Sequence, residues 1–476
     1  MAFDYDLIVL GAGPAGEKGA VQAAYFGKRV AIVECAKEPG GAAVHTGTLP
    51  SKTLRETALF LSGYRQRDLY GVDVRLNREL AVPKLLSRKD AVRDLEVARI
   101  RWNLERHGVE TLHGVARFVD AHTVEIVQLG GPPRTLTSEF FLVATGSKPH
   151  QPADIPFDDE DVDDSDTVLL IDRLPRTMTI VGGGVIGCEY ATMFAALQVK
   201  VTLIEGRGRL LPFLDLEMGE RLRASMNGLG IEIILNAKTK KVARLEGCGI
   251  RCELESGAMI DSDKFLFAAG RSGRTEELRL DRMGVKLDKR GYVAVNDDYR
   301  TEVPSIYAAG DVIGFPALAS TSMEQARVAV CHAFDFAYKR QVSHVLPYGV
   351  YTIPEVSCVG LSEESCTEQK IPYAVGRAFY RDNARGKIVG DKDGVIKLIF
   401  HAETRELLGC HCIGDRASEL VHIGQALLMG KGTVDTFIEM VFNYPTLAEA
   451  FKYAAYDALA RLAKTPAKDP PKVPVP

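Results

Sequence analysis

The sequence lacks the features that mark several specialised classes of protein. No apolar run approaches the roughly 20 residues that span a bilayer, and the acidic start at residues 1–6 is unlike a signal peptide. Neither sign of charge dominates, because 59 Lys and Arg stand against 63 Asp and Glu. Nucleic acid and anionic membranes select a basic surface. We therefore expect a cytoplasmic protein that binds neither nucleic acid nor membrane.

Cysteine is present, but without the spacing of a metal site or a disulfide framework. The chain has 9 cysteines, an odd number set far apart, and no CxxC motif. Cys410 and Cys412 are the nearest pair, and in a strand they would share one face. A redox or metal role for this pair is one interpretation, and two buried structural thiols are the simpler one. We predict no metal site.

The composition is that of a folded protein with several domains. Of the 476 residues, 46% are hydrophobic and 26% are charged, which is ordinary for globular domains and excludes a disordered or fibrous chain. At about 100–200 residues per domain, the length predicts roughly three domains.

One motif occurs twice and organises the chain. Each copy has a short apolar run suited to a buried parallel strand, then a GxGxxG turn, then a helical stretch. A second apolar strand follows and ends in an acid 23 positions after the first glycine of the motif. The glycine motifs are Gly11–Gly16 and Gly182–Gly187, and the acids are Glu34 and Glu205. The repeat predicts two copies of one nucleotide-binding unit.

The parts of this unit have distinct physical purposes. The first glycine makes a tight turn, the second lets the backbone approach a pyrophosphate, and the third lets helix and strand pack closely. The pyrophosphate lies at the helix N-terminus, where free N–H groups and the helix dipole favour an anion. The acid accepts hydrogen bonds from a ribose. Two such units predict a chain that binds two dinucleotides on a doubly wound α/β fold.

Apolar runs and turn residues predict the remaining elements. Strands are expected at 140–147, 264–271 and 305–309, and the Pro- and Asp-rich stretch 151–166 is predicted to be a linker. From about residue 347 the pattern changes. There we expect strands near 395–400 and 407–413, helices near 417–430 and 446–463, and a disordered Lys- and Pro-rich tail at 464–476.

The order of the motifs carries further information. The first glycine motif is followed by Ala144-Thr145-Gly146, by the second glycine motif and by Tyr307-Ala308-Ala309-Gly310-Asp311. This order resembles the flavoprotein reductases that bind two dinucleotides, such as dihydrolipoamide dehydrogenase and glutathione reductase, and the resemblance extends to about residue 463. It implies that the first unit binds FAD, that the second binds NAD(P), and that Asp311 holds the flavin ribityl chain.

The resemblance also implies a domain organisation. An FAD-binding domain comprises residues 1–148 and 276–345, with an NAD(P)-binding domain inserted at 149–275. A dimerisation domain at 346–463 precedes the tail. The predicted fold class is therefore α/β, with two doubly wound Rossmann-like domains and a C-terminal α+β dimerisation domain. We expect a homodimer or a higher homo-oligomer, because an apolar region without a ligand motif usually meets another subunit.

Two residues are the candidates for catalysis. Lys52 lies in the segment Pro50-Ser51-Lys52, which matches the family's Pro-Ser-Lys, and Glu189 lies two residues after the second glycine motif. The resemblance implies that these two pair beside the flavin N5 atom. A cation there stabilises an electron-rich reduced flavin. The alternative is a surface Lys and a helical Glu that have no shared role.

The departures from the family pattern decide the predicted reaction. Disulfide reductases of the family carry two redox cysteines just before Pro-Ser-Lys, and here those positions are Ala43 and Thr48. A thiolate is the required nucleophile in disulfide exchange. The family's C-terminal His is Tyr444 here, and Glu449 remains without an imidazole to orient. A phenol with a pKa near 10 is a poor proton relay. Disulfides and mercuric ion are therefore excluded as substrates.

Both departures resemble one subfamily, the soluble pyridine nucleotide transhydrogenases. The runs Gly47-Thr48, Phe442-Asn443-Tyr444-Pro445-Thr446 and His422-Ile423-Gly424-Gln425-Ala426 look like theirs. The resemblance implies hydride transfer between NADPH and NAD through FAD, in a ping-pong cycle at one nucleotide site. Several transhydrogenases keep the first cysteine, and Ala43 departs even from that. An NAD(P)H-dependent quinone or dye reductase is the alternative, and a non-catalytic redox-sensing flavoprotein is a remoter one.

Nucleotide preference is expected to depend on the end of the second acidic strand. Glu205 suits a free ribose 2′-OH and would repel the 2′-phosphate of NADP(H). Arg207 and Arg209 follow, and either could bind that phosphate, unless both are simply solvated. The sequence leaves the preference between NAD(H) and NADP(H) open.

The full set of predicted cofactor-binding residues combines the two motifs with positions implied by the resemblance. It comprises Gly11, Gly13, Pro14, Ala15, Gly16, Glu34, Gly41, Ala42, Thr48, Lys52, Ala116, Thr145, Gly146, Gly310 and Asp311 for FAD, and Gly182, Gly184, Ile186, Gly187, Glu205, Arg207 and Gly270 for NAD(H) and NADP(H).

Overall fold

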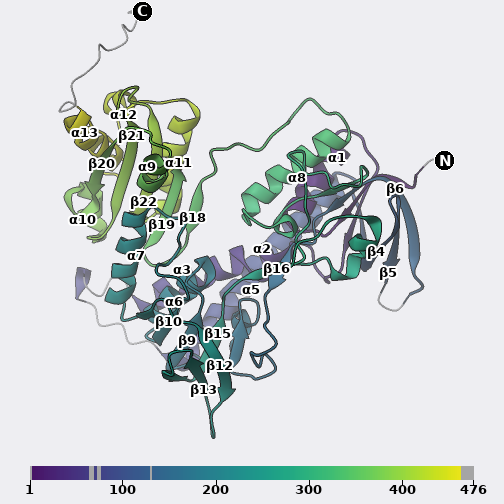
Figure 1. Ribbon diagram of the computed structural model, residues 1–476, viewed down its shortest axis with the longest axis horizontal. Coiled ribbons are helices and arrows are strands. Elements are labelled where there is room, and N and C mark those ends of the chain that lie inside the picture. Colours follow the sequence, from purple (N-terminus) through teal and green to yellow (C-terminus); the bar gives the residue numbers. More distant parts are fainter. Residues whose placement is uncertain (1–2, 64–68, 72–76, 129–130, 463–476) are drawn as a thin grey trace, which may run out of the picture.

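A computed structural model describes residues 3–63, 69–71, 77–128 and 131–462. Three β-sheets of five strands or more organise this part of the chain, each with its own helices (Figure 1). The predicted disordered tail at 464–476 lies outside the described residues. None of the described helices combines the length and the apolar character that crossing a membrane requires.

The first sheet contains the first glycine motif. Its strand order is β3-β2-β1-β6-β5-β4, and a later strand, β17, also pairs with β6. The central strands are parallel, whereas β4, β5 and β6 form an antiparallel meander. The strands are β1 (Tyr5–Leu10), β2 (Val30–Glu34), β3 (Glu110–His113), β4 (Val115–Asp120), β5 (Thr123–Val127), β6 (Arg134–Val143) and β17 (Ile306–Ala308). Because β17 lies about 160 residues after β6 in the chain, the segment between them is an insertion.

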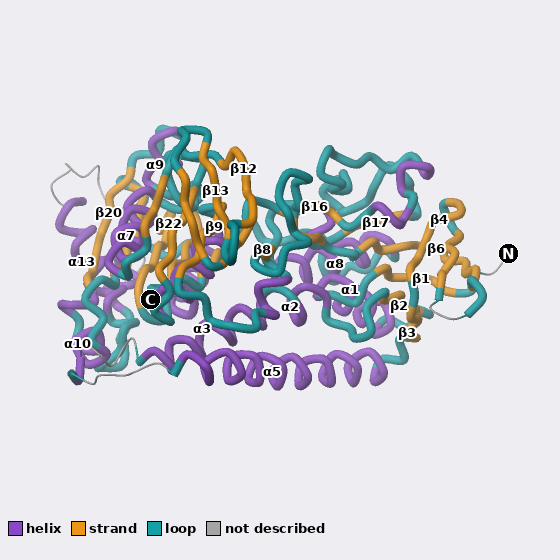
Figure 2. Tube along the Cα trace, turned by 90° about the horizontal axis from the view of Figure 1, so that it is seen from below, coloured by secondary structure: helices purple, strands orange, loops and turns teal. Residues whose placement is uncertain are grey.

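Helices cover this sheet and extend from it. Helix α1 (Pro14–Tyr25) packs beside α8 (Ala319–Ala333), so two distant segments share one face. Helix α5 (Arg78–Arg106) runs along one side of the molecule and packs against α3 (Thr48–Ser62) (Figure 2). The short helix α2 (Gly41–His45) precedes α3.

The second sheet contains the second glycine motif and is entirely parallel, in the order β11-β10-β9-β15-β8. Helices α6 (Val185–Ala196) and α7 (Leu216–Gly228) belong to it. Its strands are β8 (Val162–Asp164), β9 (Thr177–Val181), β10 (Lys200–Ile204), β11 (Glu232–Ile234) and β15 (Lys264–Phe267), and a separate antiparallel sheet comprises β12 (Thr239–Arg244), β13 (Ile250–Leu254) and β14 (Met259–Ser262).

One expectation for this region was wrong. The stretch 151–166 was predicted to be a linker throughout, yet its end forms the edge strand β8, which pairs with β15. Its acidic residues Asp163 and Asp164 are buried rather than solvated. Lys264 explains part of this, because its ammonium lies 3.5 Å from the Asp163 carboxylate. Strands β7 (Ser147–Pro149) and β16 (Arg271–Gly273) pair where the chain enters and leaves the second sheet region.

The third sheet is antiparallel, in the order β18-β19-β22-β21-β20. Its strands are β18 (Tyr348–Val350), β19 (Glu355–Gly360), β20 (Tyr373–Phe379), β21 (Val395–His401) and β22 (Leu407–Gly414), and its helices are α9 (Glu363–Glu368), α10 (Ala384–Val389), α11 (Ala417–Met429), α12 (Val434–Glu439) and α13 (Ala450–Leu462). The last helix begins at Ala450, four residues later than expected. Five short 3₁₀ helices complete the described elements: η1 (Thr167–Leu170), η2 (Glu276–Leu278), η3 (Leu280–Met283), η4 (Asp311–Ile313) and η5 (Tyr380–Asp382).

The paired cysteines of the sequence lie on β22. Cys410 and Cys412 are fully buried on one face of the strand, and their sulfur atoms are 3.9 Å apart. Among the described residues no group of three or more His, Cys, Asp or Glu side chains is arranged to hold a metal ion. The pair therefore packs as two free thiols.

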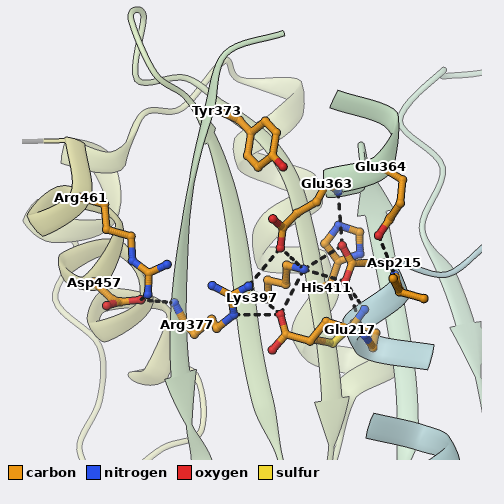
Figure 3. A network of polar contacts seen from close by, with 12 residues as sticks. Asp215, Glu217, Glu363, Glu364, Tyr373, Arg377, Lys397, His411, Asp457 and Arg461 are labelled. Atoms are coloured by element: carbon orange, nitrogen blue, oxygen red, sulfur yellow. Dashed lines mark hydrogen bonds and ion pairs between the residues drawn. The ribbon is translucent and has the colours of Figure 1, made fainter. Parts of the chain in front are cut away.

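A buried ionic network joins the second and third sheets (Figure 3). Lys397, on β21, is 1% exposed, and its ammonium lies 2.7 Å from the carboxylate of Asp215, which is 0% exposed. Asp215 also caps the N-terminus of α7, so the contact ties that helix to the third sheet. The same ammonium lies 2.5 Å from Glu363 and 3.2 Å from Glu217. Arg377 donates to Glu217 and Glu363, which extends the network along β20.

Candidate functional site

The first glycine motif forms a turn that only glycine can make. Gly11 has φ +104°, and a Cβ atom there would lie 2.5 Å from the carbonyl oxygen of Ala144. A Cβ atom on Gly16 would lie 1.8 Å from the carbonyl oxygen of Gly11, so helix α1 can approach β1 only with glycine there. Glu34, at the end of β2, accepts hydrogen bonds from the backbone N–H of Ala12 at 2.7 Å and of Ala36 at 2.8 Å. The acid is thus held beside the turn.

The second motif repeats this geometry in the second sheet. Gly182 has φ +114°, and a Cβ atom on Gly187 would lie 1.8 Å from the Gly182 carbonyl oxygen. Glu205 accepts a hydrogen bond from the N–H of Gly183 at 2.7 Å. Gly13 and Gly184 are the N-cap residues of helices α1 and α6, and neither N-terminus is capped by a side chain. Both helix ends therefore keep free N–H donors for an anion.

Both motifs open into one cavity of about 1480 Å³. This exceeds the roughly 300–1,000 Å³ of a site for one small ligand, so it has room for two. Of the predicted residues, those that line it are Gly11, Gly13, Pro14, Ala15, Glu34, Gly41, Ala42, Thr48, Lys52, Ala116, Thr145, Gly146, Gly182, Gly184, Ile186, Glu189, Glu205, Arg207, Gly270, Gly310 and Asp311.

Two predicted residues lie outside the cavity lining. Gly16 and Gly187 are the third glycines of their motifs, and they serve the approach of helix to strand instead.

The cavity-lining residues of the first glycine motif fit FAD. A Cβ atom on Gly41 would lie 2.8 Å from the Cα of Gly13, so the two backbones form a bare cradle at the uncapped end of α1. Such a cradle suits a pyrophosphate, which needs backbone N–H groups and no side chains.

The two catalytic candidates meet in the wall of this cavity. Lys52 on α3 and Glu189 on α6 are 137 residues apart in sequence, yet the ammonium and the carboxylate are 2.6 Å apart. The second oxygen of Glu189 accepts a hydrogen bond from the backbone N–H of Tyr351 at 2.9 Å. The Lys52 ammonium also lies 4.8 Å from the centre of the Tyr351 ring. The ammonium group of Lys52 is therefore surrounded by residues from the regions of all three large sheets.

The positions of the missing thiols face the same cavity. Ala43 lies in α2 and Thr48 begins α3, and both line the cavity wall. Cys35 also lines the cavity, beside Glu34, and burial and the neighbouring carboxylate raise the pKa of its thiol. A raised pKa disfavours the nucleophilic thiolate. Cys35 is also the single cysteine among the described residues that line the cavity, so it has no second thiol there with which to replace the absent pair.

Comparison with known proteins places this geometry in a family. The sequence profile described as pyridine nucleotide-disulphide oxidoreductase matches residues 5–333, and the profile of that family's dimerisation domain matches residues 346–455. The chain belongs to the pyridine nucleotide-disulphide oxidoreductase family. The predicted family and fold class are confirmed, and the third sheet is the family's dimerisation domain.

Individual relatives narrow the comparison. The chain is 44% identical over 460 residues to a soluble pyridine nucleotide transhydrogenase of Mycobacterium bovis, covering 96% of this chain and 98% of that one. It is 42% identical to a protein of the same name from Azotobacter vinelandii, covering 97% and 99%. Among solved structures, LpdA of Mycobacterium tuberculosis superimposes with a TM-score of 0.87 at 26% identity, covering 94% of this chain and 98% of that one. The flavoprotein disulfide reductase RclA of Escherichia coli gives 0.85 at 25% identity, covering 95% and 99%.

In this family member the acid of the second unit is already paired. Arg207 donates to Glu205 through Nε and Nη2, both at 3.0 Å, and through its backbone N–H at 2.8 Å. Burial opposes ionisation of Glu205, but the hydrogen bonds from Arg207 outweigh burial and lower the pKa of the carboxyl group. Arg209 donates to the backbone carbonyls of Pro212 and Leu214 instead. While it holds Glu205 in this way, Arg207 has its Nη1 group, but not the full guanidinium fork, for a 2′-phosphate.

We expect the Glu205→Gln variant to bind NADPH about tenfold more tightly, which is about 1.4 kcal/mol. The change removes a charge that repels the 2′-phosphate and weakens the hold on Arg207. The measurement is the dissociation constant of NADPH, obtained from the concentration dependence of flavin reduction in anaerobic stopped flow. The matched control is Glu220→Gln, because Glu220 also pairs with an Arg in this domain but lies away from the cavity. If neither Glu205→Gln nor Arg207→Gln changes NADPH affinity, the assignment of both residues is wrong.

Sequence reasoning missed two residues at this site. Tyr351 carried no predicted role, because its contact to Glu189 spans 162 residues of chain. Arg271 donates to the hydroxyl and the carbonyl of Ser147 and lines the cavity. Its position shortly after β15, which ends at Phe267, was the signal that marks it, since ligands bind at the carboxyl ends of parallel strands.

Proposed function

We propose that this chain catalyses hydride transfer between NADPH and NAD through bound FAD. The observation that carries the proposal is a cavity served by two intact dinucleotide units in which Ala43 and Thr48 occupy the positions of the redox thiols. Relatives 41–44% identical over nearly the full chain are named soluble pyridine nucleotide transhydrogenases, which supports it. FAD, NAD(H) and NADP(H) are the cofactors and substrates of this proposal.

The residues of the chain divide the work of binding. The free N–H groups at the start of α1 would hold the FAD pyrophosphate, and Glu34 would accept hydrogen bonds from its ribose. Asp311, which accepts a hydrogen bond from Ser147 Oγ at 3.1 Å, faces the same space and would hold the ribityl chain. Bound there, FAD supplies the two-electron chemistry, taking a hydride from one nicotinamide and giving it to another.

The catalytic pair prepares the site electrostatically. Glu189 fixes the ammonium of Lys52, which would lie beside the flavin and favour the form that carries added electrons. The second unit, at Gly182–Gly187, has a single helix N-terminus for a nucleotide pyrophosphate. NADPH and NAD would therefore use it in turn, with the first nucleotide leaving before the second binds.

The assembly and the location belong to the same proposal. The chain has the family's dimerisation domain, and we propose a homodimer built by residues 346–463, in which Tyr444 and Glu449 lie near the partner's flavin. Several side chains of this domain are exposed in the single chain, including Val441 at 93% and Tyr444 at 73%. The domain boundaries at 148, 275 and 345 also stay proposals, which the pairing of β7 with β16 and the start of β18 at Tyr348 support. A cytoplasmic location stays a prediction, which the name of the relatives, soluble pyridine nucleotide transhydrogenase, supports.

We expect initial rates to give parallel double-reciprocal lines. NADPH is varied at several fixed concentrations of an NAD analogue, without quinone. Parallel lines indicate that the first product leaves before the second substrate binds. High concentrations of either nucleotide should inhibit, because both compete for one site. Intersecting lines would contradict the single site. Turnover that appears only after a quinone is added would favour a quinone or dye reductase, and no turnover with either acceptor would favour a redox-sensing role.

A further inference from the structure

Arg55 is a buried cation that the reaction described above does not use. It lies on α3, three residues after Lys52, so the two side chains are neighbours on the helix. Only 4% of Arg55 is exposed. Its Nε and Nη2 atoms both donate to the backbone carbonyl oxygen of Thr352, at 3.1 and 3.0 Å. An Arg side chain is rarely buried to this extent, so its contact with a distant segment calls for a structural or functional explanation.

Arg55 has two carboxylate partners: its helix neighbour Glu56, whose Oε1 atom lies 2.5 Å from Nη1, and a second one from the same distant segment. Glu355 is also buried, and its Oε1 atom lies 3.2 Å from Arg55 Nη1. Its other oxygen accepts hydrogen bonds from the backbone N–H and the hydroxyl of Ser418, at the start of α11. Arg55 thus contacts the segment of residues 351–355 at two points. The fork of a guanidinium suits this, because it can serve a carbonyl and a carboxylate in fixed geometry.

The segment held by Arg55 is the one that holds Glu189. The N–H of Tyr351 donates to Glu189 Oε1 at 2.9 Å, and the N–H of Ile353 donates to the hydroxyl of Thr192 on α6 at 3.2 Å. Thr352 lies between these two donors and is 0% exposed. Glu189 in turn holds the Lys52 ammonium at 2.6 Å. The contacts close a ring that starts and ends on α3.

We propose that Arg55 is a positioning residue for hydride transfer, which acts on the Lys52 ammonium through the 351–353 segment and Glu189. Without the guanidinium, the carbonyl of Thr352 and the carboxylate of Glu355 lose a buried donor. The segment then shifts, Glu189 loses the Tyr351 donor, and the ammonium is no longer fixed. A misplacement of about 1 Å can cost about 10²-fold in rate. The inference rests on the proposed function only for the place of Lys52 beside the flavin.

The test compares Arg55→Met with the matched variant Arg78→Met. Arg78 also donates to two backbone carbonyls across a domain boundary, those of Leu174 and Pro175, but it does not line the cavity. The first readout is hydrogen exchange of the Tyr351 and Ile353 amides, in protein with FAD bound. We expect Arg55→Met to speed their exchange about tenfold, since each loses a stable hydrogen bond worth about 1.4 kcal/mol, and Arg78→Met to leave it unchanged.

The second readout is flavin reduction by NADPH in the absence of NAD, measured by anaerobic stopped flow. Arg55→Met should lower the limiting rate about 10²-fold with no change in the dissociation constant of NADPH. In a Lys52→Met background, the same change should have no further effect, because Arg55 acts through that ammonium. Arg55→Lys keeps one donor and should restore part of the rate. If Arg55→Met no longer binds FAD, Arg55→Lys takes its place in the same comparison. Its limiting rate of flavin reduction should be about tenfold lower than that of wild type.

Three results would overturn the inference. They are unchanged amide exchange in Arg55→Met, an unchanged rate of flavin reduction, or a loss of rate that persists at full size in the Lys52→Met background. None of these depends on the second substrate. A failure of the proposed transhydrogenase reaction is detected separately, as absent transfer from reduced enzyme to NAD.

Discussion

The Lys52→Met variant should reduce its flavin about 10²-fold more slowly than wild type with NADPH. Lys52 contributes a positive charge that Glu189 fixes at 2.6 Å inside the shared cavity, and Met has similar length without the charge. A fixed positive charge stabilises the electron-rich flavin of the transition state more than the oxidised flavin. Its loss should therefore lower the rate of reduction and leave the affinity for NADPH unchanged. The measurement is the limiting rate of bleaching in anaerobic stopped flow, with the dissociation constant of NADPH obtained from the same data.

The control for this variant is Lys18→Met. Lys18 lies on α1 and pairs with the buried Glu17 at 2.8 Å, so the change also breaks a Lys–Glu pair, but outside the cavity. Its rate should equal that of wild type, and both variants should keep a full complement of FAD. A normal rate of flavin reduction in Lys52→Met would show that the resemblance assigned a role that this chain does not use.

The largest loss of stability is expected from Lys397→Met. The ammonium of Lys397 is 1% exposed and is the nearest cation to Asp215, which is 0% exposed. Burial by itself would lower the pKa of Lys397, but hydrogen bonds to Asp215 and Glu363 outweigh burial and raise it. Removing one partner of a buried ion pair leaves the other charge without compensation and costs about 3–5 kcal/mol. Urea unfolding in saturating FAD measures the loss.

A second substitution separates the lost charge pair from lost packing. Asp215→Asn keeps an oxygen that can cap α7 at Glu217 and Met218 but removes the buried negative charge. The double variant should therefore recover part of the stability that Lys397→Met loses. Lys240→Met is the surface control, since Lys240 pairs with Glu253 but is 59% exposed, and it should cost less than about 1 kcal/mol. Equal losses in the buried and the surface variant would contradict this account of the network.

The same network predicts how stability depends on pH. Burial opposes ionisation of Glu217, but the hydrogen bond from Arg377 and the charge of Lys397 outweigh burial and lower its pKa from 4.5 to about 2. A carboxyl group with a depressed pKa in the folded state stabilises the fold above its unfolded pKa. The contribution of Glu217 should therefore be complete above pH 4.5 and be lost as the pH falls toward 2.

The sequence predicted those parts of the site that are local in the chain. Within each copy of the motif the first glycine and the acid are 23 positions apart, Gly11 with Glu34 and Gly182 with Glu205, so spacing alone places each pair together. The two strands and the turn between them are fixed by backbone sterics that only glycine satisfies, as the approach of Gly16 to Gly11 shows. The repeated unit was therefore readable before any tertiary structure was known.

The rest depends on contacts between distant segments. The pairing of Lys52 with Glu189 came from resemblance, since 137 residues separate them and no periodicity relates them. Tyr351 and Arg55 had no motif at all, because their partners lie 162 and 297 residues away. The burial of Asp163 was also missed, because a Pro- and Asp-rich stretch favours a loop unless a cation such as Lys264 compensates the charge. Local patterns do not record such compensation.

The measurement that tests the central claim most directly is an anaerobic titration of the flavoprotein with NADPH and then with NAD. Because Ala43 and Thr48 stand where the disulfide reductases have their redox thiols, we expect the electrons to remain on the bound flavin. One equivalent of NADPH should therefore bleach the flavin completely, without the long-wavelength charge-transfer band of a thiolate beside it, and NAD should restore the colour. A charge-transfer band, a requirement for a second equivalent of NADPH, or a flavin that stays bleached after NAD is added would contradict the account.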